Sequence, residues 1–267
     1  MNIAVGRCAL CLLEKPLQSS HLLPKALYRF VTNVGTSRDP NPVIVTPKSA
    51  WQSSKQVEAH LLCCECEQRF HSEGENWTLR HCYRGQRRFR LQEILAGTAP
   101  IADLGDALVF GAARIPAIDI RQLVHFAASV FWRASVRNWN AQEHRIRDID
   151  LGPYAEEFRR FLLGRGEFPE HAAVLVDVFG FRSITLGTMI FPYGGNQGVY
   201  HCFKFSIPGV GFNLFVGQLM PSGVRRCCTL RSPEGILWSS KKDNAIVDNF
   251  VEMMRTAKVA QRLAGGL

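Results

Sequence analysis

Hydrophobic and polar positions are spaced differently along the chain, and the differences predict which elements form. Between residues 115 and 165, apolar residues recur at helical spacing, in IDIRQLVHFAASVFWRASVRNW and again in PYAEEFRRFLL. Beyond Pro169, short runs rich in β-branched and aromatic residues predict antiparallel strands over about 172–238. A final helix is expected over about 243–263. Residues 91–267 are therefore predicted to form an α+β domain with an antiparallel sheet and flanking helices.

Gly, Pro and Asn residues separate the strand-like runs. GGNQG at 194–198 and PGVG at 208–211 predict hairpin turns. SITLGTMIF at 183–191 and RCCTLRS at 226–232 are among the runs expected to form strands. Short connections of this kind are typical of strands that pair with their neighbours in the sequence.

The first 90 residues are patterned differently, with few long apolar runs and many Cys, His, Ser and Pro residues. Residues 34–56 predict a loop around one short strand at 43–45. A helix is expected over 66–79, although its glycine weakens it by about 1 kcal/mol relative to alanine. We therefore predict a separate small module over 1–90 that has little core of its own and needs a stabilising cross-link, such as a bound metal ion.

Composition and charge narrow the class of protein. The chain has 267 residues, of which 46% are hydrophobic and 21% charged, as in folded globular proteins. No uncharged apolar run approaches the roughly 18 residues that a membrane-spanning helix needs, and the start lacks the features of a signal peptide. We therefore expect a cytoplasmic protein without a membrane partner. The first 90 residues carry 13 Lys or Arg against 7 Asp or Glu, and the rest carry 19 against 16, which favours a polyanionic partner for the first region.

Two CxxC pairs in this region indicate a metal site. They are Cys8 with Cys11, and Cys63 with Cys66. In a reducing compartment such pairs are metal or redox motifs more often than disulfides, and four thiolates suit the tetrahedral shell of zinc. We predict a structural zinc ion on these four cysteines, with a pair of metal-free turns as the alternative. The other five of the nine cysteines are expected to behave as small hydrophobic residues or surface thiols.

The order of the motifs resembles a known family. CALC at 8–11 is followed by SHLLP at 20–24 and by LLCCECE at 61–67. This succession resembles the zinc-stapled HNH endonucleases, the ββα-metal group, over about residues 5–80. The resemblance implies a treble-clef or ββα module, in which the second CxxC opens a helix. It also implies metal-dependent hydrolysis of phosphodiester bonds.

The resemblance assigns roles to individual residues. His21 is implied as the general base that takes a proton from water, and Glu67 and His71 as ligands of a catalytic Mg or Mn ion. Glu67 and His71 are four residues apart and share one helix face. Ser20 departs from the family, which has an acid or a histidine there. The alternatives are that His21 supports the turn beside the zinc and that Glu67 and His71 form a solvated helix face.

Arginines and aromatic residues alternate directly after this helix, in WTLRHCYRGQRRFRL at 77–91. Guanidinium groups pair with phosphates and aromatic faces stack on bases, so the segment is a candidate nucleic-acid contact. The alternative is a linker helix whose arginines face water. The candidate nucleic-acid-binding residues are Lys25, Arg80, Arg84, Arg87, Arg88 and Arg90.

The sequence leaves three functions to test. The first is an HNH-like endonuclease that acts on DNA, or on RNA, in the setting of phage defence or mobile elements that the resemblance implies. The second is a non-catalytic zinc module that binds nucleic acid or a protein partner. The third is a zinc staple that supports a ligand-binding C-terminal domain. That domain is also a candidate for homodimer or protein contacts.

Overall fold

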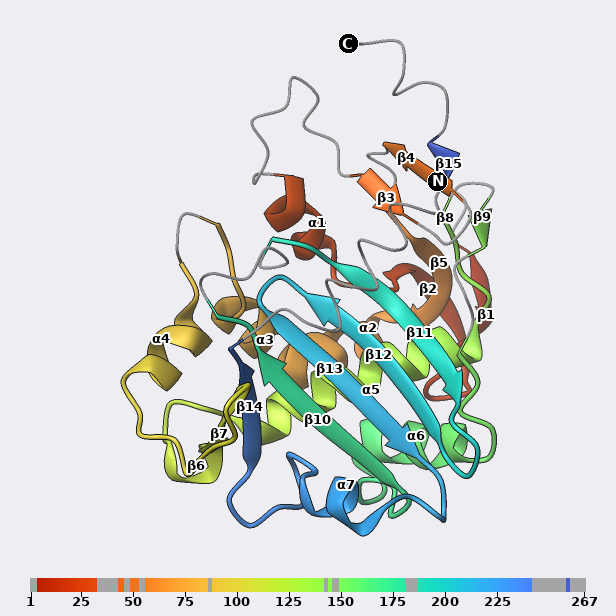
Figure 1. Cartoon of the computed structure of the whole chain (residues 1–267). Coiled ribbons are helices and arrows are strands. Elements are labelled where there is room, and N and C mark those ends of the chain that lie inside the picture. The colour runs from red at the N-terminus through yellow and green to blue at the C-terminus, as the bar shows by residue number, and fades with distance from the viewer. Residues whose placement is uncertain are drawn as a thin grey trace, which may run out of the picture.

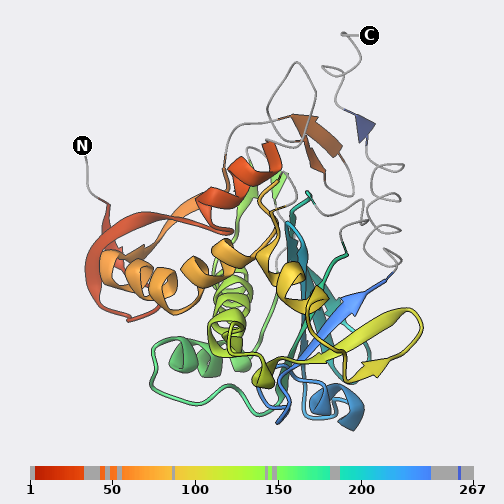
Figure 2. The ribbon, with the colours of Figure 1, turned by 90° about the vertical axis from the view of Figure 1, so that its left-hand side faces the viewer.

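The computed structural model describes residues 4–32, 43–45, 49–52, 56–85, 88–141, 144–145, 149–180, 187–241 and 258–259. These residues form an α+β architecture, as the sequence predicts. Helices pack against one face of a seven-stranded sheet, and a small three-stranded sheet lies on the far side of those helices (Figures 1 and 2). Among the described residues, no helix is both long and apolar enough to cross a membrane.

The large sheet has the strand order β11-β12-β13-β10-β14-β7-β6. Its neighbouring strands are antiparallel except β10 and β14, which are parallel. The prediction of antiparallel strands is therefore right for β10 to β13 and for the pairing of β14 with β7. It is wrong for the pairing of β14 with β10, because the chain crosses back before it forms β14. The strands are β6 (Ala102–Asp103), β7 (Ala107–Gly111), β10 (Ala172–Val178), β11 (Ile190–Asn196), β12 (His201–Ile207), β13 (Val210–Val216) and β14 (Ile236–Ser240).

The run RCCTLRS does not form the strand that its composition predicts. Its first residue ends helix α7 (Ser222–Arg226), and the rest continues in turns. Arg231 donates to the carbonyl oxygens of Phe168 at 2.9 Å and Pro169 at 2.5 Å. These contacts hold the segment as a loop against a neighbouring loop. In the run at 183–191, strand β11 begins only at Ile190, and 183–186 lie outside the described residues.

Two turns of the large sheet lie near their predicted places. The turn after β11 spans 197–200 rather than 194–198. The turn predicted at 208–211 joins β12 to β13, and its Gly209 has a φ of +84°, which favours glycine. A Cβ on Gly209 would lie 2.6 Å from the ring of Phe89, so the turn packs closely on the N-terminal third of the chain.

Helix α5 (Ile120–Val136) is the centre of the helical layer. Its first turn is capped by Asp119, whose carboxylate accepts a hydrogen bond from Gln122 N at 3.0 Å. Every residue over 123–134 is buried, because the large sheet covers one side and another helical segment the other (Figure 2). The helices predicted between 115 and 165 are confirmed as two helices. The smaller elements of this half are α4 (Arg90–Ala96), η2 (Ala112–Arg114), β8 (Asn140–Ala141), β9 (His144–Arg145) and α6 (Tyr154–Leu162).

The N-terminal half contains the predicted small elements. Its three-stranded antiparallel sheet has the order β1-β2-β5. The strand expected at 43–45 is confirmed as β3. The helix expected over 243–263 lies outside the described residues apart from Lys258–Val259. These two residues form strand β15, which pairs with β4, so the helix is wrong there. The elements are β1 (Val5–Arg7), β2 (Glu14–His21), α1 (Lys25–Thr32), β3 (Val43–Val45), β4 (Ser49–Gln52) and β5 (Glu58–Cys63).

The helix expected over 66–79 is confirmed within a longer helical segment, 64–81. One π-helical turn interrupts it, where Gly74 crosses α5. A Cβ on Gly74 would lie 2.7 Å from Phe126 N and 2.9 Å from Gln122 O. The glycine therefore permits a close crossing, in addition to the helix-weakening effect that the sequence predicts. The segment consists of α2 (Cys64–Phe70), η1 (His71–Glu75) and α3 (Asn76–His81).

A buried ion pair joins the same two helices. Arg133 of α5 is 1% exposed, and its Nη2 lies 2.5 Å from Oε1 of Glu75. The guanidinium also lies 4.7 Å from the ring centroid of Phe70. Beside it, His125 Nε2 lies 3.1 Å from Glu73 Oε2, and burial lowers the pKa of His125 to about 4, which leaves the ring neutral near pH 7. If one partner were lost, the other would remain as an unpaired charge in the core. The pair therefore stabilises the position of segment 64–81 on α5.

The domain boundary predicted at residue 90 stays a prediction. The buried side chains on its two sides form one continuous cluster, which runs from Cys8 through Phe70 and Phe126 to Leu214. The two regions therefore share a core where the helical segment meets α5.

Replacement of Gly74 by alanine tests the close crossing. Alanine is the better helix former by about 1 kcal/mol, but its methyl group would meet backbone atoms of α5. We expect Gly74→Ala to lower the free energy of unfolding by about 1–3 kcal/mol in chemical denaturation. Gly97→Ala is the control, because the nearest atoms to a Cβ there are 3.7 Å away. A Gly74→Ala protein as stable as the wild type would contradict the crossing.

Candidate metal centre

The fold brings the two CxxC motifs together at one end of the small sheet, where the edge strands β1 and β5 both finish. Cys8 and Cys11 lie in the turn between β1 and β2, which is closed by Cys8 N donating to Leu13 O at 2.9 Å. Cys63 is the last residue of β5 and the N-cap of α2, and Cys66 lies in the first turn of that helix. A CxxC turn between two strands, followed by a CxxC that opens a helix, is the order that the sequence predicts.

The four sulfur atoms form a compact cluster that could hold a metal ion. All four lie within 4.8 Å of one another, and the sulfurs of Cys11 and Cys63 are 3.9 Å apart. Zinc–sulfur bonds near 2.3 Å in a tetrahedron place sulfurs about 3.8 Å apart. Cys63 N also donates to the Cys8 sulfur at 3.3 Å, which favours a thiolate there. The donor set and spacing therefore fit a tetrahedral metal such as zinc.

Hydrogen bonding and burial set the protonation of the cluster. A hydrogen bond from the Cys66 thiol lowers the pKa of Cys8 to about 4, although burial opposes the shift. The same hydrogen bond, followed by burial, raises the pKa of Cys66. Burial raises the pKa of Cys63 to about 11. Without a cation the cluster therefore keeps protons on part of its sulfurs, and a metal must displace them to bind.

The C-terminal half supports the first CxxC turn. Arg159 of α6 donates from Nη1 to Leu10 O at 2.6 Å, between the two cysteines of the turn. The same guanidinium is held by Glu156, through Nε at 2.6 Å and Nη2 at 2.7 Å. The sequence analysis did not identify this contact, because it joins residues 149 positions apart.

His21 and Ser20 lie at the end of β2. His21 pairs with Glu58 across the β2–β5 ladder, and its Nε2 is 3.4 Å from Glu58 Oε2. The side chain of His21 is 18% exposed. Ser20 is buried, and its hydroxyl accepts a hydrogen bond from Leu62 N at 3.1 Å, beside a register shift in the ladder. The Ser20 hydroxyl is thus engaged by the backbone.

Glu67 and His71 occupy successive turns of one helix. The N–H of His71 still bonds to Glu67 O, so the two residues share a helix face, as predicted. His71 is exposed, whereas Glu67 is half-buried, and its Oε1 is buried without a hydrogen-bond partner in the described structure. Within the described ranges, the four cysteines are the only group of three or more possible ligands that lie this close together. A catalytic Mg or Mn ion on Glu67 and His71 stays a prediction.

The predicted arginine segment is exposed, but its aromatic residues pack inward. Trp77 stacks on His81 with ring centroids 4.0 Å apart. Phe89 is buried. Arg84 lies over the ring of Phe30 at 5.3 Å, which ties the segment to α1. Arg87 lies outside the described residues. The exposed candidates are Lys25, Arg80, Arg84, Arg88 and Arg90.

The sequence reasoning missed the polar contacts behind the helical segment. Glu75 and Arg133 meet across 58 positions of sequence, and the available signal was an arginine within the apolar run of α5. Comparisons of the chain with family models, with curated proteins and with solved structures found no match. The resemblance to HNH endonucleases therefore stays a prediction from the sequence motifs.

Metal content tests the cysteine cluster. We expect the purified protein to carry a single zinc ion per chain, and Cys66→Ser to lose it and to melt at lower temperature, because three thiolates and a hydroxyl bind zinc more weakly. Cys64→Ser is the matched control, since Cys64 is exposed beside the cluster. Elemental analysis and thermal unfolding measure both. A Cys66→Ser protein that keeps its full zinc content would rule out the site.

Proposed function

We propose that the N-terminal region is a zinc-stapled module that binds nucleic acid and hydrolyses its phosphodiester bonds with a divalent metal, with DNA as the favoured substrate. The observation that supports this proposal is the strand–strand–helix unit formed by β2, β5 and α2. It holds His21 against Glu58 at the end of one strand and leaves a Glu67 oxygen buried without a partner on the helix. Zinc on the four cysteines would hold this unit together.

His21 is the proposed general base. With Nε2 directed to Glu58, the Nδ1 atom is left to accept a proton from water. Glu58 orients the ring and stabilises the imidazolium that forms. Such acid–base catalysis contributes roughly 10²–10⁴-fold to a rate.

Glu67 and His71 are the proposed holders of the divalent metal. A buried carboxylate oxygen without a partner is unfavourable, and a cation would satisfy it. Carboxylate oxygen also suits Mg and Mn. When bound, the metal would stabilise the negative charge of the phosphate and of the leaving oxygen.

The exposed basic residues are the proposed phosphate contacts. Arg80 lies on α3, Lys25 opens α1, and Arg88 lies in the loop before α4. Arg84 is held over Phe30, which positions one guanidinium without neutralising it. Each phosphate contact of this kind makes binding weaken as salt increases.

A second function, binding without cleavage, is favoured by Ser20. Its hydroxyl is buried and bonded to Leu62 N, so the position that carries an acid in the family offers no carboxylate. A module of this kind would keep the zinc and the basic surface and would lack hydrolysis.

Cleavage assays separate the two functions. We expect the wild type to cleave plasmid or single-stranded DNA with Mg or Mn, and His21→Ala to reduce the rate by about 10²–10⁴-fold. Glu67→Ala should also reduce it, because the metal loses its carboxylate. His60→Ala is the matched control, as an exposed histidine on the same sheet.

Zinc content and salt-dependent binding are measured on every variant. One outcome is that the protein retains zinc and binds nucleic acid in a salt-sensitive way but cleaves it with no divalent metal. That result would contradict the nuclease function and support binding without cleavage. Absence of nucleic-acid binding at low salt would contradict both functions.

A further inference from the structure

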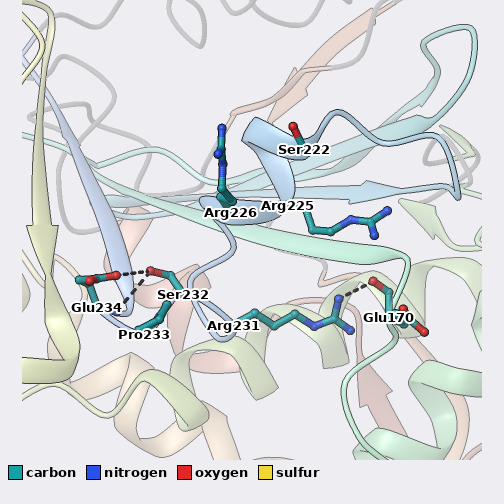
Figure 3. A pocket seen from close by; sticks show the side chains of 8 residues that line it. All are labelled: Glu170, Ser222, Arg225, Arg226, Arg231, Ser232, Pro233 and Glu234. Atoms are coloured by element: carbon teal, nitrogen blue, oxygen red, sulfur yellow. Dashed lines mark hydrogen bonds between the residues drawn. The ribbon is translucent and has the colours of Figure 1, made fainter.

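A hollow of about 490 Å³ opens at the end of the large sheet, beside α7. Figure 1 shows α7 at the bottom of the molecule, whereas α1 is near the top. The hollow therefore lies away from α1, and none of the proposed nucleic-acid contacts lines it, so it is independent of the proposed function. Its volume lies within the range of sites for small ligands, roughly 300–1,000 Å³. Its polar lining consists of Arg225, Arg226, Arg231, Ser222, Ser232, Glu170 and Glu234 (Figure 3).

The three arginines keep their positive charge uncompensated. In the part of the chain that the structure describes, Arg225, Arg226 and Arg231 form no ion pair with a carboxylate. Arg231 donates to carbonyl oxygens, including Phe168 O and Pro169 O, which fix its guanidinium without neutralising it. Figure 3 shows the guanidinium groups of Arg225 and Arg231 on the same side of the hollow, whereas Arg226 points away from both. Two positive charges on one side of a hollow repel each other unless an anion lies between them.

Arg225 adds an unused donor. Its Nη2 reaches Gln218 O at 3.3 Å, but its Nε is buried and has no partner in the described structure. Arg226 is exposed, and no contact of its side chain is recorded within the described residues. The hydroxyl of Ser222 lies on the same rim (Figure 3). Guanidinium donors and hydroxyls are the groups that recognise phosphate.

The two carboxylates limit the kind of anion. Glu234 Oε2 accepts the Ser232 hydroxyl at 3.2 Å, and Glu170 stands on the opposite side of the hollow (Figure 3). Acidic groups repel a long polyanion, but they accept hydrogen bonds from hydroxyl or amino groups. The lining therefore suits a small molecule with one phosphate and a polar organic part.

We propose that this hollow binds a small phosphomonoester, of the size and polarity of a mononucleotide, with Arg225 and Arg231 at its phosphate. The phosphate alone fills a minor part of the volume, and the sugar and base occupy the part beside Glu234.

Calorimetric titration of the full-length protein, without divalent metal, tests the proposal. The probes are adenosine 5′-monophosphate, inorganic phosphate and adenosine. We expect the monophosphate to bind most tightly, phosphate more weakly, and adenosine not measurably. Arg225→Gln should weaken binding of the monophosphate by about tenfold or more, since hydrogen bonds to a charged group are lost. Arg226→Gln should weaken it less, because that side chain points away from Arg225 and Arg231. Arg226 makes no recorded contact, so its variant is expected to fold normally.

Arg137→Gln is the control with the same charge change. Arg137 is exposed and follows the last turn of α5, a 17-residue helix whose first residue, Ile120, packs beside Gly235. The helix is about 25 Å long, so Arg137 lies well away from the hollow. Its variant should bind the monophosphate like the wild type. Equal weakening in all three variants would overturn the proposal, because the effect would be one of net charge.

Two further results would overturn the proposal. One is failure of the monophosphate to bind at millimolar concentration. The other is preferential binding of a 5′-phosphorylated oligonucleotide, with no response to the mononucleotide, which would assign the hollow to nucleic-acid ends. The titrations are repeated with His21→Ala, which is expected to bind the monophosphate normally, so that failure of the nuclease proposal does not affect the result.

Discussion

At Gly74 the helical segment that begins at the cysteine cluster comes so close to α5 that a side chain cannot be accommodated. A Cβ would lie 2.7 Å from Phe126 N, and the π-helical turn and the buried Arg133–Glu75 pair belong to the same crossing. Because α5 also packs on the large sheet, this crossing sets where the N-terminal module sits. The residues on the two sides of this crossing thereby share one continuous core.

The cysteine cluster works together with this crossing. Four sulfurs fix the β1–β2 turn to the first turn of α2, and the rest of the helix is fixed on α5. Arg159 adds a second tie, because it donates from α6 to Leu10 O inside the first CxxC turn. The module is therefore restrained at both ends. A metal at the cluster would rigidify the strand–helix junction on which His21 and Glu67 depend.

Local patterns predict the parts of this structure that local physics decides. The CxxC spacing predicted the sulfur cluster, and helical periodicity predicted α5 and the segment 64–81. The same reasoning expected Gly74 only to destabilise its helix. Helix propensity does not describe tertiary contacts, so it could not show that the glycine allows α5 to pack closely there. The sequence reasoning also expected only antiparallel pairing for β14 and a strand at RCCTLRS, although crossovers and loop contacts such as Arg231 with Pro169 O decide both. Ser20 was identified as a departure, but its bond to Leu62 N depends on the strand register.

Pairing, rather than net charge, decides where this molecule presents cations. Residues 1–90 carry most of the basic excess, yet Arg69 is paired there with Glu73. The remaining chain is nearly balanced in charge and still places three arginines at one hollow, none of them ion-paired with a carboxylate of the described residues. Arg225 and Arg231 donate there to neutral carbonyl oxygens, and Arg226 is exposed. A neutral acceptor orients a guanidinium and leaves its positive charge uncompensated, whereas a carboxylate orients the group and also neutralises its charge.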